Sequence, residues 1–332
     1  MNERTPSNFS EWRLPAALSD GYPAPSPGKA RVVAIGNFDG AHVGHRAVAE
    51  TARALAHELA GAARGTEILA LTFEPHPRRF FQPDRPHFRL VPEAQRGAAL
   101  ARIGFDGAVI LPFDGALAGL APEIFVEEIL VRRLHVDGVV VGADFHFGKG
   151  RAGTPALLQA EGKRHGFAVR FVPPFRDADG AVVASSLIRA ALGGGRIEDA
   201  NRMLGYAYSV SGPVLHGEKR GRDLGYRTAN MKLDPANGLA HGIYAVKVRL
   251  DDDRLVPGVA SFGRRPHFDN GAPLLETHLF GFDGDLYGRE IEVIFFSYLR
   301  GEAKFDSLDA LIAQMDADSR EAKRRLAAFA ET

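Results

Sequence analysis

The sequence predicts a doubly wound α/β domain followed by a small antiparallel β-barrel domain that ends in a helix. Up to about residue 204, short runs that are apolar throughout alternate with helical segments, which is typical of a parallel sheet covered on both faces. After that point, closely spaced strands with alternating polar and apolar residues are separated by Gly and Asp turns. The length of 332 residues also fits two domains of roughly 100–200 residues each.

The chain opens with a proline-rich segment, residues 1–30, which we expect to be an irregular leader laid over the first domain. It contains no apolar run long enough for a signal peptide or a membrane helix, and no later segment does either. We therefore expect a cytoplasmic protein without a membrane partner.

Residues 31–204 carry the pattern of the α/β domain. Five apolar runs are expected to form its parallel strands, and the right-handed crossover rule then gives a doubly wound sheet. The expected strands are 31–35, 67–73, 107–113, 138–142 and 167–172, and the clearest helical segments are 45–60 and 122–134.

Residues 205–332 carry the pattern of the barrel domain. From Tyr244 to Leu250 every second residue shares one face, and residues 251–253 form a turn before the next strand. After Ser307, a good N-cap, apolar residues recur at helical spacing, so we expect a closing helix to pack against the barrel. These apolar positions are Leu308, Leu311, Ile312 and Met315.

The composition excludes several functions. The chain has no cysteine, which excludes disulfides, thiolate metal sites, iron–sulfur clusters and a cysteine nucleophile. Residues 1–204 hold 24 basic and 22 acidic side chains, and residues 205–332 hold 17 and 19. Neither part has the positive surface that a long nucleic acid needs, so no nucleic-acid partner is expected. A small-molecule enzyme or a binding protein fits, and the oligomeric state, a homo-oligomer included, stays open.

The segment GNFDGAHVGH follows the first apolar run and has the chemistry of a phosphate site. Gly36 and Gly40 let the backbone turn sharply and approach a ligand. A helix that begins near His42 directs its free N–H groups and positive dipole end at that turn, which favours phosphate. His42 and His45 are three residues apart and would share one face of this helix. Gly44 would keep the surface between them low enough for a nucleotide to lie across it.

Other interpretations of glycines and histidines in this domain are weaker. The two histidines could bind a metal or be solvated at a helix start, but no third ligand follows at a recognisable spacing. Gly148, Gly150 and Gly153 match the G-x-G-x-x-G pattern of dinucleotide-binding proteins. They follow the fourth apolar run rather than the first, which disfavours hydride transfer.

The second candidate site is the segment 216–231, HGEKRGRDLGYRTANM, which opens the barrel domain. Its glycines and basic residues make a flexible loop suited to phosphate, although such a loop is more often a solvated turn. Thr228 and Asn230 would point the same way from an extended chain, and their neutral oxygens could ligate Mg²⁺ beside a nucleotide.

In both segments the chain resembles the bacterial bifunctional riboflavin kinase/FAD synthetases. GNFDGAHVGH, TFEPHP (72–77), VGADFHFGKGRAG (141–153) and SSLIR (185–189) resemble motifs of the adenylyltransferase half, a nucleotidyltransferase-type α/β domain. HGEKRGRDLGYRTANM, GVASFGRRPHF (258–268) and LLETHLFGFDGDLYG (274–288) resemble motifs of the kinase half. The resemblance covers roughly residues 31–326, with the motifs in the family's order.

The resemblance implies an FMN adenylyltransferase (FAD synthetase) domain at 31–204 that uses ATP with Mg²⁺. It implies that His42 and His45 hold ATP phosphates and stabilise charge as pyrophosphate leaves. Ser186 and Arg189 would clamp the β- and γ-phosphates, and Asp144 would lie near the FMN. The ATP-binding residues implied for this domain are Gly36, Asn37, Phe38, Asp39, Gly40, His42, His45, Ser186 and Arg189.

The resemblance also implies a riboflavin kinase domain at 205–332, which makes FMN from riboflavin and MgATP. There Glu276 would be the catalytic base for the riboflavin 5′-hydroxyl, and Thr228 and Asn230 would position Mg²⁺ and ATP. The ATP-binding residues implied for this domain are His216, Gly217, Lys219, Gly221, Arg222, Thr228 and Asn230.

Five positions depart from the family's pattern. Ala184 stands where the family has Ser, Ser186 where it has Thr, and Leu187 where it often has a basic residue. His267 stands where Thr is commoner. Arg227 replaces a proline whose fixed φ would pre-set the backbone before Thr228. Two alternatives stay open: only the adenylyltransferase half is active, or the chain is a non-catalytic flavin-binding protein.

Overall fold

The structure is a computed structural model that describes residues 6–215, 226–264 and 273–329. Contacts divide the chain into two compact units, with the division between Ser185 and Ser186. We call residues 6–185 the N-terminal unit and residues 186–329 the C-terminal unit. No helix in these ranges is long and apolar enough to cross a membrane.

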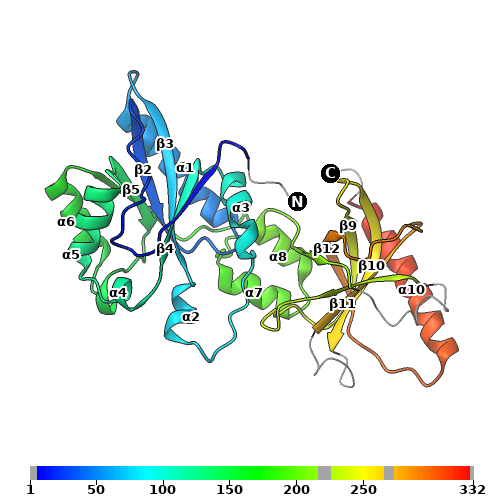
Figure 1. Cartoon of the computed structure of the whole chain (residues 1–332). Helices are drawn as coiled ribbons and strands as arrows, with labels where there is room; N and C mark the ends of the chain where they lie inside the picture. The colour runs from blue at the N-terminus through cyan, green and yellow to red at the C-terminus, as the bar shows by residue number, and fades with distance from the viewer. Residues whose placement is uncertain (1–5, 216–225, 265–272, 330–332) are drawn as a thin grey trace. The chain divides into compact units, whose positions relative to one another are not determined.

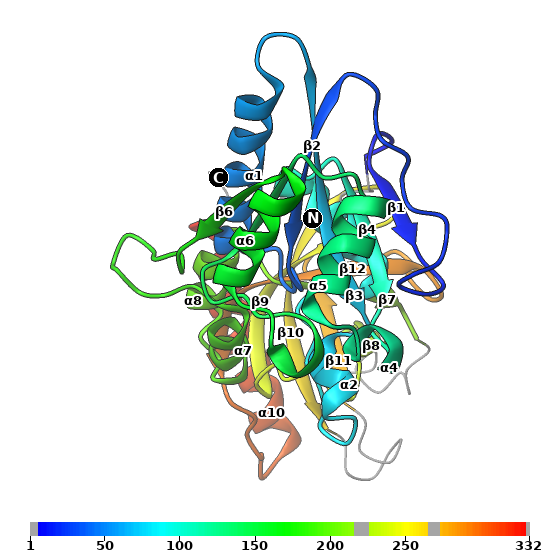
Figure 2. The ribbon, with the colours of Figure 1, turned by 90° about the vertical axis from the view of Figure 1, so that its left-hand side faces the viewer.

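The N-terminal unit is built on a six-stranded parallel sheet with the order β1-β4-β3-β2-β5-β6. The five strands that the apolar runs predict are confirmed, and helices cover both faces of the sheet (Figures 1 and 2). Val32 and Ala34 pack on the side of α1, whereas Val33 and Ile35 pack on the opposite layer. The strands are β1 (Ser10–Arg13), β2 (Lys29–Ile35), β3 (Gly65–Glu74), β4 (Gly107–Pro112), β5 (Gly138–Gly142) and β6 (Ala168–Val172).

Two layers of helices bury the sheet. One layer contains α1 and α3, and the other contains α5, η2 and α6. The predicted helix at 122–134 forms as α5 followed by η2, a π-helix in which Leu134 N–H donates to the Ile129 carbonyl. The helices are α1 (Val43–Ala60), α2 (Pro77–Phe81), η1 (Glu93–Gln95), α3 (Arg96–Arg102), α4 (Gly115–Ala118), α5 (Pro122–Ile124), η2 (Phe125–Arg133), η3 (Lys149–Arg151) and α6 (Pro155–His165).

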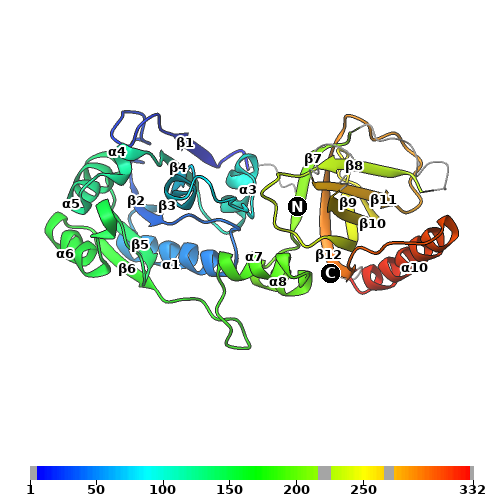
Figure 3. The same ribbon diagram turned by 90° about the horizontal axis from the view of Figure 1, so that it is seen from below.

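The expectation of an irregular leader is wrong for β1, which adds an edge strand parallel to β4 (Figure 3). The leader is held further along by Arg31, whose buried side chain donates to the carbonyl of Pro23 at 2.9 Å and pairs with Glu67 at 2.5 Å. Ser26 also donates to Glu67, at 2.6 Å. The pairing of β1 with β4 and the hydrogen bonds of the buried Arg31 side chain therefore hold the proline-rich segment in place, although its prolines led us to expect an irregular chain.

The C-terminal unit is built on a six-stranded antiparallel sheet with the order β7-β12-β9-β10-β11-β8. A bridge from Leu215 N–H to the Asn230 carbonyl, at 2.8 Å, links its two ends and makes the sheet a nearly closed barrel. The predicted barrel is thus confirmed. The strands are β7 (Ser209–Pro213), β8 (Thr228–Lys232), β9 (Gly242–Arg249), β10 (Leu255–Arg264), β11 (Pro273–Leu279) and β12 (Glu290–Arg300), and the helices are α7 (Ser185–Gly193), α8 (Ile197–Leu204) and α10 (Leu308–Ala327).

Helix α8 belongs to the C-terminal unit by its contacts, although the sequence predicts the domain boundary after residue 204. Asn201 donates to the Phe295 carbonyl at 2.9 Å and accepts from Tyr208 N–H at 2.7 Å. Ser297 donates to Glu198 at 2.6 Å. These bonds join α8 to β12 and to the residue that precedes β7.

Helix α10 begins at Ser307, whose side chain accepts from Ala310 N–H, as predicted. The helix packs against the barrel as predicted, but not through all the expected residues. Leu308 is 55% exposed, and Leu311, Ile312 and Met315 are half-buried, whereas Ala322 and Leu326 near the end of α10 are buried against Ala245 of β9. Helical spacing identifies an apolar face, but it does not decide which turns of that face the barrel covers.

The edge strand β1 provides the first test. A Cβ at Gly107 would lie 2.7 Å from the Trp12 ring and 2.9 Å from the Ser10 carbonyl oxygen. Gly107→Ala should therefore displace β1 and cost about 1–3 kcal/mol in the free energy of unfolding. Trp12 is the only tryptophan, so its emission should shift to longer wavelength. Gly115→Ala, where a Cβ meets nothing within 4 Å, is the control. Unchanged emission in Gly107→Ala would contradict the docking of β1.

Candidate active sites

The fold places the predicted phosphate loop at the carboxyl end of β2. The connection through β3 and β4 lies on one side of β2, and β5 lies on the other. In open parallel sheets, ligands bind outside the carboxyl ends of the strands at such a switch point. The loops that follow β3 and β5 open at the same edge because all the strands are parallel.

The backbone of this loop has positive φ angles at three residues, and two of them are not glycine. The φ angles are 50° at Phe38 and 38° at Ala41, and 92° at Gly40. The Phe38 ring is buried, with ring centroids 5.3 Å from His45 and 5.2 Å from Phe105. Backbone strain of this kind gathers at functional sites and persists where packing enforces it.

His42 and His45 occupy the start of α1 as the sequence predicts. His42 is the N-cap, and its Nδ1 accepts from His45 N–H at 3.3 Å. A neutral His42 therefore carries its proton on Nε2. The two rings stack with centroids 3.6 Å apart. Two imidazole rings thus lie at the positive end of the helix dipole.

Gly44 lies against the His42 ring, and its predicted role under a nucleotide stays a prediction. A Cβ there would lie 3.2 Å from the His42 ring and 3.3 Å from Phe175 Cβ. The missing side chain therefore makes room for the His42 ring to fold back over the helix start.

His45 is held neutral near pH 7. Burial keeps the pKa of His45 well below the ordinary value of 6.5, and the neighbouring His42 lowers it further. This ring therefore offers an N–H or a lone pair rather than a full positive charge.

Asp39 connects three segments of the N-terminal unit. Its buried carboxylate accepts from Leu90 N–H at 3.0 Å and from Val91 N–H at 3.3 Å. Its carbonyl accepts from the Ser185 hydroxyl at 2.8 Å. The sequence motif SSLIR draws attention to Ser186, so this role of Ser185 was missed.

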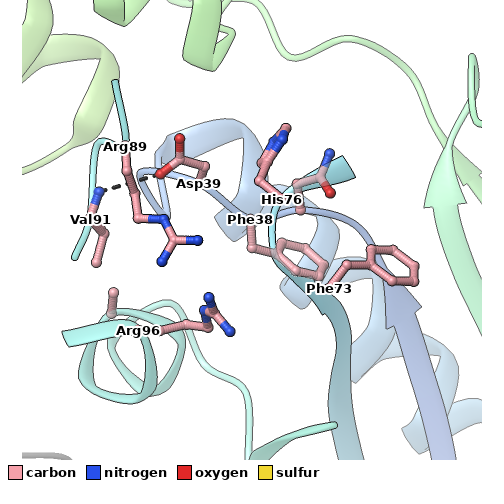
Figure 4. Close-up of a pocket in the computed structure, with 9 residues that line it drawn as sticks. Phe38, Asp39, Phe73, His76, Arg89, Val91 and Arg96 are labelled. Carbon is pink, nitrogen blue, oxygen red and sulfur yellow. Dashed lines mark hydrogen bonds between the residues drawn. The ribbon is translucent and has the colours of Figure 1, made fainter. Parts of the chain in front are cut away.

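A small cavity that is open to solvent lies beside the loop. Asn37, Phe38 and Asp39, which the resemblance assigns to ATP binding, are among its lining residues, and Figure 4 labels the last two of them. The sequence analysis did not predict the other residues that line the cavity. The TFEPHP motif at the end of β3 was the one feature of the sequence that pointed to any of them. These other residues are Phe73, His76, Arg89, Val91, Arg96 and Ala99.

The remaining predicted residues of this site are not brought into the cavity. Asp144 is exposed just after β5 and is not among the lining residues. Ser186 and Arg189 lie on α7 in the C-terminal unit, so their meeting with His42 stays a prediction.

The C-terminal unit brings together the predicted kinase residues through strand register. Asn230 of β8 lies directly opposite Glu276 of β11, and Thr228 lies opposite His278. Side chains of directly opposed residues share a face and have Cβ atoms about 5 Å apart. An amide, a hydroxyl and a carboxylate therefore stand on one face of the barrel.

His278 was missed by the sequence reasoning. Its Nδ1 lies 2.9 Å from the Arg227 carbonyl, and since a carbonyl only accepts, this nitrogen carries the proton. Its ring contacts Tyr226 with centroids 4.8 Å apart, and the Tyr226 hydroxyl donates to Asp316 of α10. The backbone just before Thr228 is thus held from two sides although residue 227 is not proline.

Other predicted kinase residues lie outside the described part of the chain. These are His216, Gly217, Lys219, Gly221 and Arg222, together with His267. Within the described ranges, no three His, Cys, Asp or Glu side chains form a group that could hold a metal ion.

The fold and these two sites define a two-domain enzyme that transfers phosphorus-containing groups from a nucleotide. A family model described as FAD synthetase matches residues 25–187, and one described as riboflavin kinase matches residues 204–326. The chain belongs to the family of bifunctional riboflavin kinase/FMN adenylyltransferases. It is an enzyme with both activities, and both use ATP-dependent chemistry, which generally needs a divalent metal.

Curated relatives carry that name. The chain is 38% identical to one from Haemophilus influenzae over 289 residues, which span 87% of this chain and 92% of the relative. It is 36% identical to one from Escherichia coli K12 over 293 residues, 88% of this chain and 92% of the relative. It is 40% identical to one from Pseudomonas fluorescens over 288 residues, 86% and 90% of the two chains.

A solved structure shares the fold along both units. It is a crystal structure from Streptococcus pneumoniae, titled a macrolide-efflux protein, with a TM-score of 0.83 and 29% identity. The likeness covers 95% of this chain and 98% of that one.

The buried His45 predicts a pH dependence of stability. The unfolded chain takes up a proton at the ordinary pKa of 6.5, whereas the native state resists it. The free energy of unfolding should therefore fall as the pH drops below about 6.5, by up to about 1.4 kcal/mol per pH unit from this group. In His45→Gln the free energy of unfolding should lose this part of its dependence on pH. Urea unfolding followed by Trp12 emission at several pH values measures it. His57→Gln, at an exposed position of the same helix, is the control. Equal slopes for wild type and His45→Gln would contradict the assignment.

Proposed function

We propose that FMN adenylylation takes place at the start of α1 in the N-terminal unit. The observation that carries this proposal is the helix start itself, where the N-cap His42 and the stacked His45 lie at the positive end of the α1 dipole. These groups would bind ATP phosphates and stabilise the pyrophosphate as it leaves. Ser186 and Arg189 would clamp the β- and γ-phosphates, and Asp144 would lie near the FMN.

In this reaction the FMN phosphate attacks the α-phosphorus of ATP in line, and the bond to pyrophosphate breaks. No covalent enzyme intermediate is needed, so the protein contributes positioning and charge stabilisation. Gly36 and Gly40 let the backbone approach the nucleotide, and Asn37, Phe38 and Asp39 would line the cleft on one side. The buried Asp39 carboxylate would act by holding the loop rather than by touching ATP.

The proposed kinase site is the face of the barrel that carries Glu276, Asn230 and Thr228. The observation that supports it is the register that sets Asn230 opposite Glu276. Glu276 would accept the proton of the riboflavin 5′-hydroxyl as that oxygen attacks the γ-phosphorus of ATP, and the bond from this phosphorus to the bridging oxygen breaks as ADP leaves. The loop with His216, Gly217, Lys219, Gly221 and Arg222 would cover the phosphates.

We propose Mg²⁺ as the divalent metal of the kinase site. Thr228 and Asn230 supply neutral oxygens beside a carboxylate, which is the hard donor set that Mg²⁺ prefers, and phosphate oxygens and water would complete it. When bound, the ion would neutralise charge on the ATP phosphates.

The setting of the enzyme stays a prediction. We expect it in the cytoplasm, where ATP is available, with small-molecule substrates and without a nucleic-acid partner. Whether the chain forms a homo-oligomer is open, and size measurement in solution would decide it.

Two substitutions should separate the activities. Glu276→Gln should lower FMN formation from riboflavin by about 10²–10⁴-fold because the base is lost, while FAD formation from supplied FMN continues. His45→Ala should do the reverse, with a loss of about 10²-fold or more in FAD formation and accumulation of FMN. Each variant is the folding control for the other, with flavins separated by chromatography.

The two family matches decide against the alternatives of a single active half and of a non-catalytic flavin-binding protein. The same assay tests the assignment of the two sites. Equal loss of both activities in either variant would contradict the assignment of the two sites.

The hydrogen bond from His278 predicts a further effect on the kinase. We infer that His278 is a positioning residue, because its N–H holds the carbonyl of Arg227 next to Thr228. His278→Phe keeps the ring contacts but removes the donor, and should lower kcat of riboflavin phosphorylation about 5- to 10-fold. His278→Asn can place an N–H near the same point and should therefore keep most of the wild-type kcat. An equal decrease of kcat in His278→Phe and His278→Asn would contradict the positioning role of His278.

A further inference from the structure

The cavity beside the phosphate loop contains two guanidinium groups that face the same space. Arg89 and Arg96 both line it and point toward one another across it (Figure 4). Both also bind the Glu74 carboxylate at the end of β3. Arg89 Nη2 lies 2.8 and 2.6 Å from its two oxygens, and Arg96 Nη2 donates to one of them. One carboxylate thus orients two arginines toward the cavity.

Arg96 keeps a donor without an acceptor. Its side chain is only 13% exposed, and its buried Nη1 has no hydrogen-bond partner among the described residues. Buried polar groups are nearly always hydrogen-bonded, so an orphaned N–H calls for a partner that is not part of this chain.

The nearby carboxylates are already engaged. Glu74 accepts from both arginines, and Asp39 accepts from the backbone of Leu90 and Val91. Acidic and basic groups around the cavity are close to balanced, so net charge does not point to a ligand. Arg96 does, because it lines the cavity and keeps one buried guanidinium donor unfilled among the described residues.

The position of the cavity indicates the class of ligand. Its wall includes Asn37, Phe38 and Asp39, the residues that lead into the helix start proposed for ATP phosphates. A guanidinium presents its N–H groups as a planar fork that matches the oxygens of a phosphate. The two substrates of FMN adenylylation, ATP and FMN, both carry phosphate groups.

We propose that Arg96, oriented with Arg89 by Glu74, binds a phosphate group of a substrate during FMN adenylylation. The proposal rests on the adenylyltransferase site described above. The phosphate can come from the 5′-phosphate of FMN or from the polyphosphate of ATP, and the two sources are distinguished by which Michaelis constant changes. The rival interpretation is structural: the arginines only fix Glu74.

The experiment measures FAD formation by the full chain, with the KM for FMN and the KM for ATP determined separately. Arg96→Gln should raise one of them about 10- to 100-fold, with a smaller change in kcat, because a charged hydrogen bond is lost. Arg96→Lys keeps the charge and should recover part of the loss. Glu74→Gln weakens the carboxylate contact that orients Arg96 and should raise the same KM, but less than Arg96→Gln does.

Arg53→Gln is the matched control. Arg53 pairs with Asp106 at 2.8 Å in the same unit but does not line the cavity, so both KM values should stay within about twofold of wild type. Trp12 emission reports folding of the N-terminal unit, and riboflavin phosphorylation reports the C-terminal unit. FAD formation by wild type is tested first, which separates failure of the adenylyltransferase site from failure of this proposal.

The outcomes decide between the two interpretations. A rise in the KM for FMN assigns the site to the monoester, and a rise in the KM for ATP assigns it to the polyphosphate. The proposal is overturned if Arg96→Gln leaves both KM values within twofold. It is also overturned if Arg96→Gln and Glu74→Gln reduce kcat equally with neither KM changed, because the arginines then only support Glu74.

Discussion

The N-terminal site depends on the hydrogen bonds of Asp39. Its carboxylate holds the segment of Leu90 and Val91, and its carbonyl holds Ser185 at the end of the unit. These bonds keep the left-handed backbone around Gly40 in place and bring the segment with Arg89 beside the phosphate loop. A buried carboxylate that accepts backbone N–H groups is well suited to this task, because its removal would leave these donors unpaired.

The two units collect polar groups by different means. In the parallel sheet, loops that are distant in sequence meet because all the strands end at one edge. In the antiparallel barrel, Glu276 meets Asn230 because register sets them opposite each other. Both arrangements place groups suited to phosphate chemistry on a rigid sheet, so an enzyme without net charge can carry two nucleotide-dependent reactions.

Much of the fold could be predicted from the sequence, and the features that could not be predicted have a common cause. The apolar runs predict the inner strands because their side chains are buried on both faces, as Val33 and Val140 are. The edge strand β1 could not be predicted in this way, because only one side of it pairs and Trp12 is only half-buried. The sequence did not point to Arg96, because its side chain is held by Glu74, which lies 22 residues earlier in the chain.

The sequence alone determined the class of each domain, the glycine turn at Gly36–His45 predicted to bind phosphate, and the polar positions on the barrel strands. Local spacing is enough for this, since periodicity and turn residues act over a few positions. Only the tertiary structure decided which turns of α10 are buried, that Gly44 makes room for His42, and that Arg96, which lines a cavity, keeps a buried donor unfilled. These features depend on groups that are distant along the chain, and packing in three dimensions is what brings such groups together.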